Sequence, residues 1–167
     1  MTSNWLEECL IQEIEEVCSG LYLKGVNGER KALKGYMEAL PQLSLPEKWD
    51  EEESNSLGDT EPEDALIPYF IVRTPELSYM EDGAQAKVYL VFCIYDCDEK
   101  MKGYQALWNI LNRITGRFRS DTALDAFFCS REMKAVIQDE DTYPYYFGGI
   151  EMIWHLPDWE CEEMNNE

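Results

Sequence analysis

The stretch AKVYLVFCIYD, residues Ala86 to Asp96, decides the fold, because it is almost continuously apolar and rich in β-branched and aromatic side chains. Such a run predicts a strand that is covered on at least one face of a sheet. A second run of the same kind, ALIPYFIVRT, precedes it at residues 65–74. Because Glu81-Asp82-Gly83 supplies turn chemistry between the two runs, we predict an antiparallel pair of strands joined by a long loop.

Two segments with helical periodicity flank this pair of strands. Residues 102–118 carry apolar side chains at spacings of three and four, which predicts an amphipathic helix. Residues 4–19 combine the same apolar spacing with glutamates on the remaining positions, and this pattern predicts a second amphipathic helix. Residues 21–46 follow that helix, and we expect a short hairpin or an irregular segment there, with a turn at Asn27-Gly28.

The C-terminal part of the chain alternates between apolar and polar residues in two places, 131–139 and 149–156, and each place predicts a strand. One face of the second strand is expected to carry Ile150, Met152 and Trp154. The order helix, strand, strand, helix, strand, strand is typical of an α+β fold. We therefore predict a single domain over residues 1–167, with one mostly antiparallel or mixed sheet of about four strands and two main helices packed on one face.

An aromatic run, YPYYFGGIEMIWHLP, occupies residues 143–157 near the end of the chain. We predict a turn over residues 139–149, in which Pro144 fixes the backbone and allows a cis bond. Gly148-Gly149 would let the chain reverse into the last strand. With no polar catalytic group nearby, the aromatic residues of this turn are expected to anchor the sheet edge or a neighbouring subunit. These residues are Tyr143, Tyr145, Tyr146 and Phe147.

Acidic residues dominate the composition, with 34 Asp and Glu against 14 Lys and Arg and a formal net charge of −20. This charge repels phosphate backbones and anionic lipids, so no DNA-binding or membrane-binding surface is predicted. Residues 46–64 and 158–167 are rich in acids, and we expect a flexible loop and an acidic C-terminal tail there. We also predict no membrane span, because no apolar stretch is long enough, and no secretory signal, because the start is acidic.

Few residues combine into a pattern that supports chemistry. The single histidine, His155, lies on a predicted strand without a metal-ligand pattern, and there is no glycine-rich phosphate loop. Asp96, Asp98 and Glu99 are able to hold a divalent cation, but acids before a helix more often complement its N-terminus. Six cysteines without a Cys-x-x-Cys pair indicate reduced, buried thiols, as in an intracellular compartment. We predict no catalytic residue, no cofactor and no metal.

One segment departs from the acidic composition, because residues 100–120 contain five cations and no acid. Arg113 and Arg117 are neighbours one turn apart on the predicted helix, and Arg119 follows them. Cations in the last turns of a helix complement its dipole. They also suit a basic patch that pairs with an acidic surface, either residues 47–64 or the same region of a neighbouring copy. We predict all three arginines as interface residues.

The order of these elements resembles that of the small tail-completion, or tail-terminator, proteins of long-tailed bacteriophages and prophages. The resemblance covers about residues 66–157 and depends on short words within the pattern. They are IPYFIVRT, AKVYLVFCIYD, GYQALWNILNRI and DTYPYYFG, followed by a closing strand with Trp154 and Pro157.

The resemblance implies a structural protein and not an enzyme. Members form a ring, commonly of six copies, that caps the growing tail tube and presents a surface for joining the filled head. The implied partners are further copies of the chain, the tail tube protein and head–tail connector proteins, while DNA passes through without specific binding. The implied location is the virion tail or neck, after assembly in the bacterial cytoplasm. Two alternatives stay open: an acidic monomeric interaction or inhibitor protein that mimics nucleic acid, and a metal-dependent enzyme.

Overall fold

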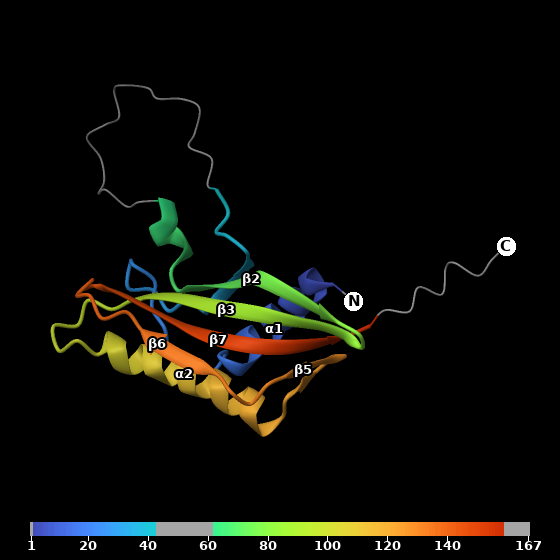
Figure 1. Cartoon of the computed structure of the whole chain (residues 1–167). Helices are drawn as coiled ribbons and strands as arrows, with labels where there is room; N and C mark the ends of the chain where they lie inside the picture. Colours follow the sequence, from blue (N-terminus) through green and yellow to red (C-terminus); the bar gives the residue numbers. More distant parts are fainter. Residues whose placement is uncertain (1, 43–61, 159–167) are drawn as a thin grey trace, which may run out of the picture.

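The computed structural model describes residues 2–42 and 62–158, in which two long helices accompany one sheet (Figure 1). The helices are α1 (Ser3–Val17) and α2 (Gly103–Ser120), and a short 3₁₀ helix, η1, spans Pro62–Leu66. The strands are β1 (Lys34–Met37), β2 (Tyr69–Met80), β3 (Gly83–Tyr95), β4 (Ala123–Leu124), β5 (Phe127–Cys129), β6 (Lys134–Ile137) and β7 (Tyr145–Pro157). The predicted α+β class is confirmed. Most of the expected acidic loop and acidic tail, residues 46–61 and 159–167, lies outside the described residues.

The sheet is mixed and has seven strands, which corrects the prediction of about four. Its order is β1-β2-β3-β7-β5-β4, and β6 pairs with β7 on the same side as β5. β1 pairs with β2 in parallel, and the other pairs are antiparallel. Strands β1, β4 and β5 have between two and four residues each, so they are too short to show an alternating pattern in the sequence.

Strands β2 and β3 form the antiparallel pair that the sequence predicts, but the prediction of a long loop between them is wrong. Met80 pairs directly with Gly83, so only Glu81 and Asp82 make the turn. The polar residues before and after the turn belong to the strands. They resemble a loop in sequence because this end of the hairpin extends beyond the core, where side chains on both faces meet water.

Both helices cover the same face of the sheet, as predicted, and the core lies between them and the strands. Alternate residues of β3 point into this core, and the two helices contribute residues spaced three and four apart. The fully buried side chains include Leu6, Leu10 and Ile14 of α1, Leu107, Leu111 and Ile114 of α2, and Val88 and Phe92 of β3. The predicted inner face of the last strand is confirmed, because Ile150, Met152 and Trp154 are buried in the same core.

Among the residues that the structure describes, neither α1 nor α2 lies on the opposite face of the sheet, which is called the helix-free face below, and only the short η1 borders it through Leu66. Near β1, a second, small cluster covers it, and this cluster centres on Ile67, Tyr69 and Cys93. Farther along the strands, Val91 and Val136 lie on either side of Gly149, and they are 37% and 49% exposed. This face therefore presents apolar side chains to solvent in the middle of the sheet.

The predicted turn over residues 139–149 is shorter than expected, because β7 already begins at Tyr145. Gly148 and Gly149 lie inside this strand and do not reverse the chain. A Cβ atom at position 149 would lie 2.8 Å from the carbonyl oxygen of Leu90, so glycine allows the close approach of β7 to β3. The Tyr143–Pro144 peptide bond is cis, which the sequence analysis allowed.

Residues 18–42 lead from α1 to the edge of the sheet. A bridge between Lys24 and Arg30 encloses the predicted turn at Asn27-Gly28, and Gly28 has a φ of 80°. The conformation at Gly28 favours glycine, because a side chain there would be strained. The predicted turn is thus confirmed. The segment also contains strand β1, which was not predicted from the sequence.

Candidate assembly surfaces

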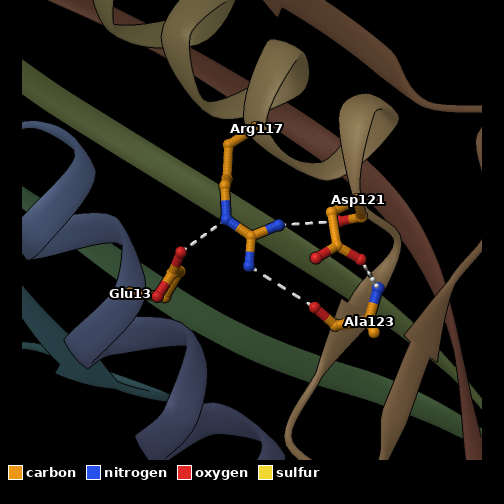
Figure 2. A network of polar contacts seen from close by, with 4 residues as sticks. All are labelled: Glu13, Arg117, Asp121 and Ala123. Carbon is orange, nitrogen blue, oxygen red and sulfur yellow. Dashed lines mark hydrogen bonds and ion pairs between the residues drawn. The ribbon is translucent and has the colours of Figure 1, made fainter.

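The guanidinium of Arg117 is bound within the chain (Figure 2). Its Nε lies 2.5 Å from Oε1 of Glu13, and its Nη1 donates to the carbonyl oxygen of Asp121 at 2.7 Å. Its Nη2 donates to the carbonyl oxygen of Ala123 at 3.4 Å. Arg117 therefore connects α1, the C-terminus of α2 and the start of β4. The acid that it binds belongs to α1, and neither sequence-based interpretation had named that helix.

Arg113 and Arg119 occupy different environments on α2. Arg113 donates from Nη1 to the carbonyl oxygen of Val17 at 3.4 Å, so it meets the C-terminal end of α1. Arg119 is exposed and lines a hollow of about 440 Å³ together with Arg131 and Glu132. Two of the three predicted interface arginines thus contact α1 of their own chain, and Arg119 is exposed at the end of α2.

Tyr146 is a core residue, which corrects its prediction as an interface anchor. Its side chain is only 2% exposed, and its ring meets the edge of Tyr104 with 4.7 Å between the ring centroids. Its hydroxyl lies 3.6 Å from Sδ of Met101. A Cβ atom at Gly103 would lie 2.1 Å from the Tyr146 ring, so the glycine at the start of α2 makes room for it. The physical reason is strand parity, because residue 146 points to the same face as Ile150.

The other three aromatic residues of this segment lie nearer the surface. Tyr143 is 40% exposed, and its hydroxyl donates to the carbonyl oxygen of Cys97 at 2.7 Å. The hydroxyl of Tyr145 lies 3.1 Å from Oδ1 of Asp64, and burial together with this carboxylate raises the pKa of Tyr145. Phe147 is half-buried in the small cluster on the helix-free face. These contacts fix the segment to its own chain, and a role in binding a neighbouring subunit stays a prediction.

The acids that follow β3 order the turn before α2. Oδ1 of Asp96 accepts from the backbone N–H of Asp98 at 2.9 Å, and Oδ1 of Asp98 accepts from that of Lys100 at 2.8 Å. Oδ2 of Asp98 also lies 3.9 Å from Nζ of Lys102. In the parts of the chain that the structure describes, no three His, Cys, Asp or Glu side chains are grouped as metal ligands would be. Nor is any helix there long and apolar enough to span a bilayer.

A buried carboxyl group lies between α1 and the sheet edge. Glu7 is 0% exposed, and its Oε1 accepts from the hydroxyl of Thr74 at 2.8 Å. The backbone N–H of Thr74 donates to Oε1 of Glu38 at 3.1 Å, so Thr74 holds the two glutamates together. Burial and the contact with Glu38 raise the pKa of Glu7 to about 8, while the hydrogen bond with Glu7 lowers the pKa of Glu38.

The second oxygen of Glu7, Oε2, is buried without a donor. A proton on Glu7 resolves this, because the protonated oxygen then donates to the ionised Glu38. The raised pKa of Glu7 and the lowered pKa of Glu38 favour a single proton on the pair, carried by Glu7. Glu7 was not recognised as a candidate from the sequence, although its position three residues before Leu10 places it on the apolar stripe of α1.

The five cysteines that the structure describes carry thiols and form no disulfide with one another. Three are buried, as predicted: Cys18, Cys93 and Cys129. Burial raises the pKa of Cys18 to about 11 and that of Cys129 to about 12, which makes both thiols poor nucleophiles. The prediction of buried thiols is wrong for Cys97, which is exposed.

Comparison with known proteins adds no relative, because no protein-family model and no curated protein matches the sequence. The resemblance to tail-terminator proteins therefore stays a prediction from the sequence. The function has to be argued from the surfaces that the fold leaves open.

Proposed function

We propose that the protein is a structural component of a bacteriophage tail, which assembles into a ring that caps the tail tube and joins it to the head. The observation that carries this proposal is the helix-free face of the sheet. In the middle of this face Val91 and Val136 flank Gly149 and are 37% and 49% exposed, and Phe128, which is 54% exposed, lies on the same face at the level of His155. Neighbouring exposed apolar side chains such as Val91 and Val136 are typical of a surface that another protein covers.

Two further features are compatible with this proposal. The short words that carry the resemblance fall in or next to β2, β3, α2 and β7, and the resemblance itself comes from the sequence alone. The net charge of −20 suits the lumen of a ring through which DNA passes, since it repels phosphates and does not retain them.

Native mass spectrometry of the full chain, with and without tail tube protein, tests the proposal. We expect oligomers at tens of micromolar chain, or oligomers that form on tube ends seen by electron microscopy. Replacing Val91 and Val136 by Ser should weaken assembly while leaving the far-ultraviolet circular dichroism unchanged. Trp108→Ser is the matched control, because Trp108 is 41% exposed on α2, on the helix side of the sheet.

A chain that stays monomeric and does not bind tube ends would refute the proposal. If such a monomer instead captured a basic protein, with affinity falling steeply as salt rises, the acidic inhibitor would be the better assignment. Assembly and capture of a basic protein are both measured on the same preparation, so one experiment distinguishes the ring protein from the acidic inhibitor.

A further inference from the structure

Two strands have no strand on their outer side within the part of the chain that the structure describes. On one side of the sheet, β1 covers β2 only as far as Val72, so residues 76–80, the β2 edge, pair with β3 alone. On the other side, residues 134–137 of β6, the β6 edge, pair with β7 alone. Figure 1 shows β2 and β6 on opposite sides of the β3–β7 pair. Strand edges of this kind are templates for pairing with another chain.

The β2 edge directs the backbone groups of two residues away from its own sheet. The backbone N–H of Glu38 donates to the carbonyl oxygen of Val72 at 2.8 Å, so Val72 directs its backbone groups away from β3. The bulge that follows inserts one residue and shifts this alternation by one. Beyond the bulge, it is therefore Leu77 and Tyr79 whose N–H and C=O groups point away from β3.

The β6 edge presents backbone groups with the same spacing. The backbone N–H of Gln138 donates to the carbonyl oxygen of Phe147 in β7 at 2.9 Å. Because backbone groups alternate along an antiparallel pair, Ala135 and Ile137 direct theirs away from β7. Each edge thus offers two residues, spaced two apart, whose N–H and C=O groups are able to join an antiparallel ladder.

The two edges differ in charge. Residues 74–86, which contain the β2 edge, carry three acids and no cation. The β6 edge contains Lys134, and beside it lies the hollow of about 440 Å³ that Arg119, Arg131 and Glu132 line. Cations therefore exceed acids around the β6 edge. This charge difference favours pairing between the two unlike edges over pairing of either edge with itself.

The hollow beside the β6 edge lies where an added strand would place a side chain of the β2 edge. Tyr79 pairs with Ala84, which packs against the main core, so the Tyr79 ring lies on the helix side of the sheet. This ring is 81% exposed. The hollow is on the helix side too, because its lining includes Thr115 of α2 together with Met133 and Ala135, which pack against the main core.

We propose that the β2 edge of one copy pairs with the β6 edge of the next copy, antiparallel and with Ser78 opposite Lys134. Tyr79 then enters the hollow between α2 and β6 of the neighbour, and Glu81 lies opposite Arg131. The inference rests on the proposed function and assigns the contact from which the ring is built. In such a ring one continuous sheet passes from copy to copy.

The strand directions are compatible with this contact. β6 is antiparallel to β7, which runs in the same direction as β2, so copies of equal orientation present β6 antiparallel to β2. Unlike edges on opposite sides of a chain make a head-to-tail contact, and such contacts close into rings when the rotation between copies allows it.

The register also predicts how neighbouring copies are displaced. Within one copy, Lys134 is level with Tyr89 of β3 through Glu151, whereas Ser78 is level with Gln85. Neighbouring copies are therefore staggered by four residues along the strands, or about 13 Å. Strands that are staggered in this way tilt against the axis of the ring, as the closure of a sheet into a barrel requires.

Disulfide formation between single-cysteine chains tests the contact. Ser78→Cys and Lys134→Cys are made in separate chains that also carry Cys97→Ser and Cys161→Ser, and the two are mixed at tens of micromolar, with and without tail tube protein. Mild oxidation should join one chain of each kind, because facing residues of an antiparallel pair lie within disulfide distance. Ala135→Cys in place of Lys134→Cys is the matched control. Its side chain lies on the other face of the sheet, so its yield with Ser78→Cys should be at least about 10-fold lower.

Removal of the Tyr79 ring gives a second readout. Tyr79→Ser should lower the apparent association constant at least about 10-fold in native mass spectrometry, because the ring no longer fills the hollow of the neighbour. Tyr22→Ser is the control, since it removes another exposed ring, from the loop after α1 and away from both edges. It should assemble like the wild type. Circular dichroism verifies that both variants are folded.

The outcomes separate this inference from the proposed function. Wild-type oligomers whose cysteine variants give no mixed disulfide, or equal yields with Lys134→Cys and Ala135→Cys, overturn the strand pairing and leave the ring in place. Assembly of Tyr79→Ser like the wild type does the same. A disulfide of the Ser78→Cys chain with itself would show a two-fold contact between β2 edges, which also overturns the pairing. A wild-type chain that neither assembles nor binds tube ends overturns both proposals.

Discussion

The carboxyl pair of Glu7 and Glu38 makes the stability of the fold depend on pH, and a single substitution removes this dependence. Gln at position 7 needs no proton, because its amide oxygen is able to accept from the Thr74 hydroxyl as Glu7 does and its amide N–H is a donor for Glu38, the neighbour that helps to raise the pKa of Glu7. We expect E7Q to match the wild-type free energy of unfolding near pH 5 and to exceed it near pH 8. Arg73 is the cation near the pair, where it helps to lower the pKa of Glu38, and it remains in place.

The magnitude follows from the pKa of Glu7, which burial raises from 4.5 to about 8. Between these two values the folded chain binds one proton more than the unfolded chain, so the wild-type free energy of unfolding falls by about 1.4 kcal/mol per pH unit. Over the whole window the loss is at most about 5 kcal/mol. The pKa of Glu38 is lowered, so its contribution is lost only as the pH falls below the ordinary range of a carboxyl group. It therefore leaves the slope in this window unchanged.

Urea unfolding followed by circular dichroism, at about pH 5, pH 6.5 and pH 8, measures the difference between E7Q and the wild type. Glu8→Gln is the matched control, because it removes one carboxylate from an exposed position of the same helix. The free energy of unfolding of that variant should change with pH in the same way as that of the wild type. The reasoning fails if the free energy of unfolding of E7Q also follows that of the wild type from about pH 5 to about pH 8.

Three further results are expected. Arg117→Gln should lower the free energy of unfolding by about 1–3 kcal/mol in thermal or urea unfolding, because it leaves a half-buried acid of α1 and two carbonyl groups without their donor; a loss below about 0.3 kcal/mol would contradict this role. Gly103→Ala should destabilise the fold by about 1–3 kcal/mol through the clash with the Tyr146 ring, and the second substitution Tyr146→Leu should recover part of that loss. Cys97 should react with a thiol reagent well before Cys129 in native buffer, as peptide mapping would show, and equal rates would indicate that the chain opens around Cys129.

Sequence patterns located the elements whose residues face the core. Residues 86–96 and 102–118 were predicted correctly in type, because continuous apolar runs and three-four spacings reflect burial directly. The outer half of the hairpin was missed for the same reason. Its residues extend past the core, so the composition of Glu76 to Met80 reflects exposure to solvent and does not indicate a strand.

The candidate surfaces were predictable only in part. Arg117 was recognised as unusual, but its partner Glu13 lies 104 residues away, and no local pattern links the two. Tyr146 was misplaced because the glycines at 148 and 149 suggested a turn, whereas β7 uses them for close contact with β3 and α2. The exposed end of the β2–β3 hairpin became visible only when the register showed which residues lie beyond the core.

The pairing of β3 with β7 decides when the core can be completed. β3 is the central strand, and its thirteen pairs with β7 run from Gly83↔Pro157 to Tyr95↔Tyr145. Until residues 145–157 have been synthesised, β3 lacks one of its two neighbours, and its inward side chains, such as Leu90, lack part of their cover. A chain that has been synthesised only as far as β6 therefore cannot complete the core. The two long helices and β2 should gain their full packing only when β7 takes its place beside β3.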